Sequence, residues 1–363
     1  MSIRKYAALL LLAPALLVSR PLPAQTAQPV ANGGDAENAA PDVVSDPEES
    51  VLADPEQPGA VTHKLSGARL IAYNLVHEKF DDLDSMASQY RSEKSRYVGG
   101  GWKLTAFYGA LYAPHQTDKD TREHLEHLKH WIEQRPDSIT ARVALAASLH
   151  RWAWVARGNG MADTVTDEGW RLFNQRIEAS LTVLKDAAKL KEKCPGWYSE
   201  MMIVGLAQGW NGKRMRETFE QAIEFEPGYF DFYKLYTHYL LPKWEGQPGE
   251  AIAFAGSAAD KVGGATGDEI YFHIACEIIG KNGAEYGVKK MDWPRIQRGY
   301  QAQITQFGSN RWLKNKIAFF AWKFQDAAFA RQQFDVIDNH WSADVWHNRQ
   351  QFDRARDWAR GHS

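Results

Sequence analysis

Apolar residues recur at spacings of three and four along almost the whole chain from residue 64 onward. One such stripe consists of Leu125, Leu128 and Ile132. This spacing places apolar side chains on one face of an α-helix, whereas a half-buried strand would alternate apolar and polar residues. Alternation of that kind is nowhere sustained. The pattern therefore predicts an all-α domain over residues 64–363.

Polar cap residues and prolines mark the expected helix boundaries. Asp137-Ser138 and Asp167-Glu168 stand just before long apolar stripes, where N-cap residues are found. The second of these helices should end before Cys194-Pro195-Gly196. Gly99-Gly100-Gly101 follows no predicted strand, so we interpret it as a flexible turn and not as a phosphate-binding loop.

The first 24 residues have the pattern of a secretory signal peptide. Arg4 and Lys5 precede an apolar run from Ala7 to Val18, and the small residue Ala24 follows as a cleavage site. The run is shorter than the roughly 20 residues that span a bilayer. We expect cleavage after Ala24, a periplasmic or secreted mature protein, and no transmembrane segment in the mature chain.

Charge is distributed unevenly along the chain. Residues 25–63 contain eight of its 45 acidic residues, no Lys or Arg, and no aromatic residue. Such a segment cannot bury enough apolar surface to fold, so it is predicted to be a disordered acidic linker. Only three of the 43 basic residues precede residue 64, so the remaining domain is nearly balanced in charge. This balance argues against a nucleic-acid partner.

Small and aromatic residues recur in the helical part as they do in helix–turn–helix repeats. The tetratricopeptide unit has an Ala-x3-Phe step in its second helix and a closing proline. The small residues let two helices approach closely, and a phenylalanine such as Phe219 or Phe334 fills the gap to the neighbouring pair. The matching sets are Phe219, Ala222 and Pro227; Ala318, Ala321, Ala330 and Phe334 around the turn Gln325-Asp326; and Leu128, Trp131 and Pro136.

On these residues the chain resembles the tetratricopeptide-like superfamily of α-solenoids. The resemblance implies a right-handed stack of antiparallel helix pairs with a concave surface, whose usual work is binding. A closer resemblance is to a bacterial family of secreted or periplasmic helical-repeat proteins classed as a domain of unknown function, and it implies a fold and a compartment but no catalytic residue. The residues that carry it are Trp102-Lys103-Leu104, Phe107-Tyr108, Trp154, Ala156-Arg157-Gly158, Thr164-Val165-Thr166, Gly169-Trp170-Arg171-Leu172-Phe173, Leu240-Leu241-Pro242-Lys243-Trp244 and Gly246.

Tryptophan and cysteine each leave two interpretations open. The chain has 14 tryptophans, which could form a surface for stacking sugars or peptides, or fill wide gaps between helices. We favour gap filling for most of them. The two cysteines, Cys194 and Cys276, could pair in an oxidising compartment, or Cys276 could be a buried small hydrophobe.

Histidines are candidates for a metal site. His124, His127 and His130 are spaced so that neighbouring pairs share a helix face, and His124 with His127 is the candidate pair. Interspersed charged residues favour a solvated face instead. His273 and Cys276 form a second pair, in an apolar helix where a core histidine is the expected role. We expect no metal and no cofactor.

The first candidate binding surface is the loop Ala156–Thr166, which follows Trp154. It carries Arg157, Asn159 and Asp163 and is longer than the 2–8 residues usual between paired helices. It could form a recognition patch. Alternatively, Arg157 and Asp163 could pair with each other and hold an irregular loop.

The second candidate surface consists of Tyr233, Tyr236, His238, Lys243 and Trp244, and the last two lie just beyond Pro242, where a helix has ended. Tyr236 and Tyr239 precede Pro242 at helical spacing and are expected in the core. Lys243 and Trp244 are expected to be accessible.

Catalytic signatures are missing from the sequence. It contains no Gly-x-Ser-x-Gly, no His-Glu-x-x-His and no Cys-x-x-Cys. We therefore predict a non-enzymatic scaffold that binds a protein or peptide. One alternative is an α-helical enzyme that acts on peptidoglycan or other glycans with tryptophan platforms and two carboxylates. Another is a structural partner in a secretion or envelope assembly.

Overall fold

The computed structural model describes residues 67–112, 117–281 and 284–361. These residues form sixteen α-helices, one 3₁₀ turn and one isolated β-bridge, so the all-α prediction is confirmed. The predicted signal peptide (1–24) and acidic linker (25–63) lie outside the described residues. The helices are α1 (Gly67–Val76), α2 (Phe80–Ser92), α3 (Lys103–Leu111), α4 (Asp118–Gln134), α5 (Ile139–Arg157), η2 (Ala162–Thr164), α6 (Asp167–Ala187), α7 (Pro195–Ala207), α8 (Gly212–Phe225), α9 (Phe230–Tyr239), α10 (Glu250–Val262), α11 (Gly264–Lys281), α12 (Ala284–Val288), α13 (Trp293–Phe307), α14 (Arg311–Lys323), α15 (Ala327–Ile337) and α16 (Arg349–Gly361).

The predicted helix starts agree with the structure to within one residue. Ser138 is the N-cap of α5, and its hydroxyl accepts a hydrogen bond from the backbone N–H of Ala141. Thr166 caps α6 in the same way, through the N–H of Gly169. Each cap satisfies a backbone donor that has no partner within the helix. Pro195 opens α7, where the missing N–H of proline costs no hydrogen bond.

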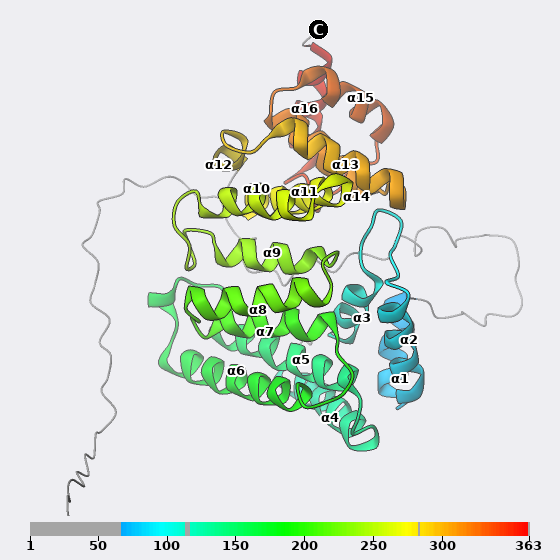
Figure 1. The fold of residues 1–363 in the computed structure, drawn as a ribbon, viewed down its shortest axis with the longest axis vertical. Coiled ribbons are helices and arrows are strands. Elements are labelled where there is room, and N and C mark those ends of the chain that lie inside the picture. Colours follow the sequence, from blue (N-terminus) through cyan, green and yellow to red (C-terminus); the bar gives the residue numbers. More distant parts are fainter. Residues whose placement is uncertain (1–66, 113–116, 282–283, 362–363) are drawn as a thin grey trace, which may run out of the picture. The chain divides into compact units, whose positions relative to one another are not determined.

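Consecutive helices pack against one another, and a second set of contacts links alternate helices. Helix α5 contacts α7, α7 contacts α9, and α9 contacts α11. These four helices form one row. Helix α6 contacts both α5 and α7, α8 contacts both α7 and α9, and α10 contacts both α9 and α11. In Figure 1, the helices α6 to α10 lie one above another in the order of the chain. The middle of the chain thus consists of one connected row of helices with a second row packed on it.

The residues that suggested helical repeats are buried where helices meet. Phe219 of α8 stacks on Tyr236 of α9, with 4.5 Å between ring centroids, and contacts Phe254 of α10 edge to face at 5.4 Å. Ala222 is fully buried on the same helix. In the last part of the chain, Phe334 of α15 is also fully buried. The phenylalanines therefore occupy the gap-filling positions that the spacing predicted.

The tryptophans lie mostly between helices. None of the fourteen is exposed: Trp102, Trp131, Trp210 and Trp346 are buried, and the other ten are half-buried. This distribution agrees with the interpretation that most of them fill gaps. Half-buried rings retain an accessible edge, so the same residues also contribute to the surface.

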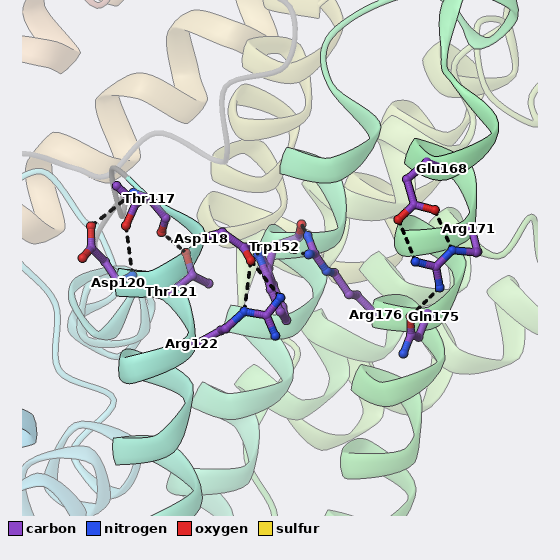
Figure 2. Close-up of polar contacts among 10 residues, drawn as sticks. All are labelled: Thr117, Asp118, Asp120, Thr121, Arg122, Trp152, Glu168, Arg171, Gln175 and Arg176. Carbon is purple, nitrogen blue, oxygen red and sulfur yellow. Dashed lines mark hydrogen bonds and ion pairs between the residues drawn. The ribbon is translucent and has the colours of Figure 1, made fainter.

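One half-buried tryptophan, Trp152, connects the three helices α4, α5 and α6 (Figure 2). Trp152 of α5 donates its indole N–H to Asp118 of α4 at 2.8 Å, and the Arg176 guanidinium of α6 lies 3.4 Å from its ring centroid. Arg176 also donates to the Trp152 carbonyl at 2.8 Å. Arg122 pairs with Asp118 and flanks the same ring. These contacts fix α4, α5 and α6 to one another, which is a structural role.

The glycine run behaves differently from the prediction of a flexible turn. Gly99 and Gly100 have φ values of +90° and +83°, a region that favours glycine. The Gly99 N–H donates to the Phe307 carbonyl at 3.1 Å, and the Gln303 side chain donates to the Gly99 carbonyl at 2.6 Å. The turn is therefore anchored on α13, about two hundred residues away. The prediction was wrong because long-range contacts, which the local sequence does not show, hold the turn.

Both cysteines are free thiols in the structure. Cys194 is buried beside the Tyr108 hydroxyl at 3.2 Å, and Cys276 is half-buried on α11. Burial raises the pKa of the Cys276 thiol to about 11, so this thiol is protonated and unreactive at neutral pH.

Among the helices of the described ranges, none is both long enough and apolar enough to cross a bilayer.

Candidate functional site

The first predicted surface begins on the last turn of α5. Trp154 and Arg157 belong to this helix, and the connecting loop runs from Gly158 to Thr166. Gly158 ends the helix with a φ of +72°, and the 3₁₀ turn Ala162–Thr164 shortens the irregular part of the loop. The loop is thus a little shorter than the predicted Ala156–Thr166, because α5 continues to Arg157.

The Arg157 side chain folds back over its own loop. Its guanidinium donates to the carbonyls of Gly158 at 3.1 Å and Gly160 at 3.0 Å. It also lies 5.3 Å from the ring centroid of Trp154 and 5.2 Å from that of Trp170. The alternative in which Arg157 pairs with Asp163 is therefore wrong in its detail: Arg157 does hold the loop, but through backbone carbonyls and two rings.

The polar residues farther along the loop are at the surface. Asn159 and Asp163 are both exposed. They sit on a loop that Arg157 fixes at its base, so they are displayed on a rigid support. Loops of this kind commonly carry binding residues.

The structure brings the two predicted surfaces together. The rings of Trp154 and Trp244 meet edge to face, with 6.4 Å between centroids and 89° between planes. Trp154 packs edge to face on Phe173 of α6 at 4.9 Å. Trp244 is half-buried, and its indole nitrogen is buried without a hydrogen-bond partner in the described structure. Lys243 beside it is exposed.

A tight turn after α9 places Trp244 against Trp154. The Trp244 N–H donates to the Leu241 carbonyl at 2.9 Å, and the Glu245 N–H donates to the Tyr239 carbonyl at 3.2 Å. A Cβ on Gly246 would lie 1.9 Å from the Leu240 carbonyl oxygen, so only glycine allows this close approach. The prediction that Trp244 is accessible is thus only partly right, because one face of its ring is packed.

A half-buried polar pair lies next to Trp244. His238 of α9 and Glu277 of α11 are 2.7 Å apart, Nδ1 to Oε1, and both are mostly shielded from solvent. The His238 ring lies 5.1 Å from that of Trp244, centroid to centroid. The pair links α9 to α11 and supports the turn that carries Trp244. As predicted, Tyr236 and Tyr239 of α9 are in the core.

The other histidines that the structure describes do not form a metal centre. The His124 ring nitrogen lies 3.4 Å from the Ser148 hydroxyl, and His130 faces the carboxylates of Glu78 and Glu133. Within the described ranges, no group of three His, Cys, Asp or Glu residues is arranged to hold a metal ion. His273 is buried on α11, as expected for a core histidine.

One group of charged residues that the sequence did not single out is buried between α5 and α7. His150 Nδ1 and Glu200 Oε2 lie 2.6 Å apart, in a geometry that does not make a proper hydrogen bond. The guanidinium carbon of Arg151 lies 4.3 Å from the ring centroid of Tyr112, and burial lowers the pKa of Arg151.

A second group missed by the sequence analysis surrounds a small cavity between the segment 93–102 and helices α11 and α13. Arg96 and Glu269 both line it. They come from positions far apart in the chain, and neither belongs to a recognisable motif. The local signals near this place were the glycine run beside Trp102 and His273, which lies 3.9 Å from Glu269.

Comparison with known proteins gives a family match without a function. Residues 70–202 match the model of a family described as "Domain of unknown function (DUF4034)". The match extends from α1 into α7 and includes the loop after α5 but not Trp244. It supports the expected similarity to an uncharacterised domain family. No curated protein is similar enough to the chain to be matched.

Proposed function

We propose that this protein is an exported helical-repeat scaffold that binds a protein or peptide and catalyses no reaction of its own. In this proposal the body is a tetratricopeptide-like solenoid of antiparallel helix pairs. The mature chain works in the periplasm or outside the cell, after removal of the predicted signal peptide.

Two observations support the solenoid. Each of α6, α8 and α10 bridges two neighbouring members of the row formed by α5, α7, α9 and α11, as stacked helix pairs would. Fully buried alanines such as Ala222 and Ala330 lie where helices meet, and small side chains there permit close approach.

The observation that carries the binding proposal is the meeting of Trp154 and Trp244. Together with Arg157, Trp170 and Lys243 they form what we call the tryptophan corner. Half-buried indoles held by a packed core lose little freedom on binding, and tryptophan and arginine most often dominate binding energy. The corner presents them on two supports, the end of α5 and the turn after α9. We therefore place the partner contact there.

A capture experiment tests this proposal. The purified mature protein is used as bait in a periplasmic extract, and retained proteins are identified by mass spectrometry. Trp244→Ala and Arg157→Ala should each lose the retained partner. The matched controls Trp358→Ala and Arg171→Ala, at sites outside the corner, should keep it. Equal capture by all four variants would contradict the assignment of the corner.

Stability must be followed alongside capture because Trp244 is partly packed. Circular-dichroism melting curves identify any variant that has lost its fold. Trp244→Phe serves as a second variant, since it keeps an aromatic ring against Trp154 while shortening the exposed edge. Reduced capture with an unchanged melting curve is the expected result.

The enzyme alternative has its own readout. The protein is incubated with purified peptidoglycan, and reducing ends are measured over time. We expect no release above a boiled control. Release of reducing ends by the native protein would replace the scaffold proposal with the glycan-enzyme alternative.

The compartment is tested by intact-mass measurement of protein recovered from the periplasm. Cleavage after Ala24 gives a chain that begins at Gln25. A recovered chain that still begins at Met1 would contradict the proposal of export through a cleaved signal peptide.

A further inference from the structure

A small cavity lies where the segment 93–102 crosses the later helices. Its volume is about 240 Å³, below the roughly 300–1,000 Å³ of pockets for drug-sized ligands. A cavity of this size suits a molecule as small as a single amino acid. Its walls are formed by Lys94, Arg96, Trp102, Glu226, Gly228, Phe230, Thr266, Glu269, Ile270, Gln306 and Phe307.

The walls of the cavity are held by long-range contacts. The Gly99 carbonyl accepts from Gln303 of α13, and the Asn310 side chain donates to the Val98 carbonyl at 3.0 Å. On the other side, Thr105 of α3 donates to Asp231 of α9 at 2.7 Å. Three segments that are far apart in the sequence are thereby held together around the cavity. A site formed in this way is organised before any ligand arrives.

Arg96 supplies the positive charge of the cavity. Its guanidinium lies 3.6 Å from the ring centroid of Trp102 and donates to the carbonyls of Gly100 at 2.8 Å and Gly228 at 3.1 Å. Within the described part of the chain it makes no ion pair. Burial lowers the pKa of Arg96 to about 10, with carboxylates such as Glu269 offsetting this only in part. The Arg96 guanidinium therefore has two backbone carbonyls and a ring as partners, but no carboxylate within ion-pair distance among the described residues.

Glu269 supplies the negative charge. It is 7% exposed, and its Oε1 is buried without a hydrogen-bond partner among the described residues. The nearest basic group is His273 Nε2 at 3.9 Å, which also lacks a hydrogen-bond partner. Burial lowers the pKa of His273, so its ring is neutral at neutral pH and does not balance the carboxylate.

The other two charges at the cavity already balance each other. Lys94 Nζ lies 2.8 Å from Glu226 Oε2, with Lys94 mostly in solvent. One cation and one anion, Arg96 and Glu269, thus remain without an ion-pair partner in the same small space. The indole N–H of Trp102 is also buried without a hydrogen-bond partner among the described residues, so it is an unused donor. Buried polar groups without hydrogen-bond partners, such as Glu269 Oε1 and the Trp102 N–H, are unfavourable unless something satisfies them.

We propose that this cavity binds a free α-amino acid, whose carboxylate pairs with Arg96 and whose ammonium group pairs with Glu269. The Trp102 N–H is a second donor for the carboxylate. Phe230 and Phe307 supply apolar wall for the side chain of the ligand. A simple anion would leave Glu269 unpaired, and a simple cation would leave Arg96 unpaired. Only a compact zwitterion satisfies both.

This site is separate from the tryptophan corner. None of the residues that line the cavity belongs to the corner. Loss of ligand binding at the cavity and loss of partner capture at the corner are therefore distinguishable. Neither result depends on the other.

The test compares one free amino acid with two derivatives, of which one lacks the ammonium charge and the other lacks the carboxylate charge. Isothermal titration calorimetry is run on the mature protein with L-valine, N-acetyl-L-valine and L-valinamide, and is repeated with glycine and L-phenylalanine to vary side-chain size. We expect at least one of the three free amino acids, L-valine, glycine and L-phenylalanine, to bind. For that amino acid, the N-acetyl and amide derivatives should bind at least tenfold more weakly, because each removes one charge. Failure of all three free amino acids to bind at millimolar concentration, or equal binding of the derivatives, would overturn the proposal.

Variants connect binding to the two charges. Glu269→Gln, which keeps the size of the side chain, should weaken binding of the free amino acid at least tenfold while leaving the N-acetyl derivative unaffected. Glu93→Gln, on the exposed start of the same segment, is the matched control and should bind as the native protein does. Unchanged affinity in Glu269→Gln, with circular dichroism showing a native fold, would contradict the assignment. If Glu269→Gln fails to fold, Arg96→Lys gives the same test for the carboxylate end of the ligand.

Discussion

The Trp154 ring meets the Trp244 ring edge to face, at 6.4 Å between centroids and 89° between planes. This contact joins the end of α5 to the turn after α9, and it joins two segments that are ninety residues apart in the chain. Aromatic rings prefer such an arrangement because the positive edge of one faces the negative face of the other. The contact should therefore stabilise the fold as well as shape the surface.

A double-mutant cycle measures that contribution. Trp154→Ala and Trp244→Ala are made singly and together, and free energies of unfolding are taken from urea titrations. We expect a coupling energy of about 0.5–1.5 kcal/mol, the range for aromatic pairs. The control cycle pairs Trp154→Ala with Trp358→Ala, which lies in a different core cluster, and should be additive. A coupling near zero for the first cycle would show that the rings do not stabilise each other.

Truncation of the gap-filling phenylalanines tests the packing. Phe219→Ala and Phe334→Ala should each lower the free energy of unfolding by about 3–5 kcal/mol, because both rings are buried between helices. Phe225→Ala is the matched control on α8. Its ring is 41% exposed, so the loss there should stay below about 1 kcal/mol. Equal losses at positions 219 and 225 would contradict the observed packing.

The glycine run offers a test with an internal control. Alanine at Gly99 would adopt an unfavourable positive φ, at about 1–2 kcal/mol for an L-residue, and its Cβ would lie 2.2 Å from the Asn310 side chain. Gly99→Ala should therefore destabilise the protein by at least that amount. The nearest atom to a Cβ on Gly101 is 4.0 Å away, so Gly101→Ala should be nearly neutral. Urea titrations of both variants give the comparison, and similar stability would mean that the turn is not anchored.

Burial of His273 predicts a dependence of stability on pH. Its folded-state pKa lies below the ordinary 6.5, mainly because of burial and despite the neighbouring carboxylates of Glu269 and Asp231; Lys234 lowers it further. Between the folded pKa and about 6.5 the unfolded chain binds a proton that the folded protein does not, so stability falls as the pH is lowered through this window. The loss is about 1.4 kcal/mol per unit of pKa depression.

His273→Gln removes this titration. Its free energy of unfolding, measured between pH 7 and pH 5, should fall less steeply than that of the native protein. His127→Gln, at a half-buried position on α4, is the control for a histidine substitution elsewhere in the fold. Parallel curves for the native protein and His273→Gln would show that His273 does not contribute to the acid sensitivity.

Local features of the fold were predictable from the sequence because local interactions determine them. Ser138 was recognisable as a cap because its hydroxyl bonds a backbone N–H three residues on. Phe219 and Ala222 were recognisable because their spacing places both on the buried face of one helix. Such signals act within one or two helical turns, which is the range that sequence patterns describe.

The candidate sites were predictable only in part, because they depend on tertiary contacts. The sequence indicated Trp154 and Trp244 as separate candidates, and only the structure shows that they touch. Arg96 and Glu269 gave no signal, since an unpaired buried charge is visible only when all of its neighbours are known. Gly99 was misinterpreted for the same reason, as its partners Gln303 and Phe307 are about two hundred residues away.

The anchoring of the segment 93–102 has a consequence for how the chain reaches its native state. Contacts between residues 98–99 and residues 303–310 have very high sequence separation, and forming them requires closure of a loop of about two hundred residues. During synthesis this segment therefore stays without these contacts until α13 has emerged, and the ring of Trp102 stays without its contact to Tyr229 until α9 is formed. An isolated fragment limited to residues 70–202, the part matched by the family model, would keep that surface open permanently. The later helices thus complete the N-terminal part of the chain, so the folding unit is larger than the region that matches the family model.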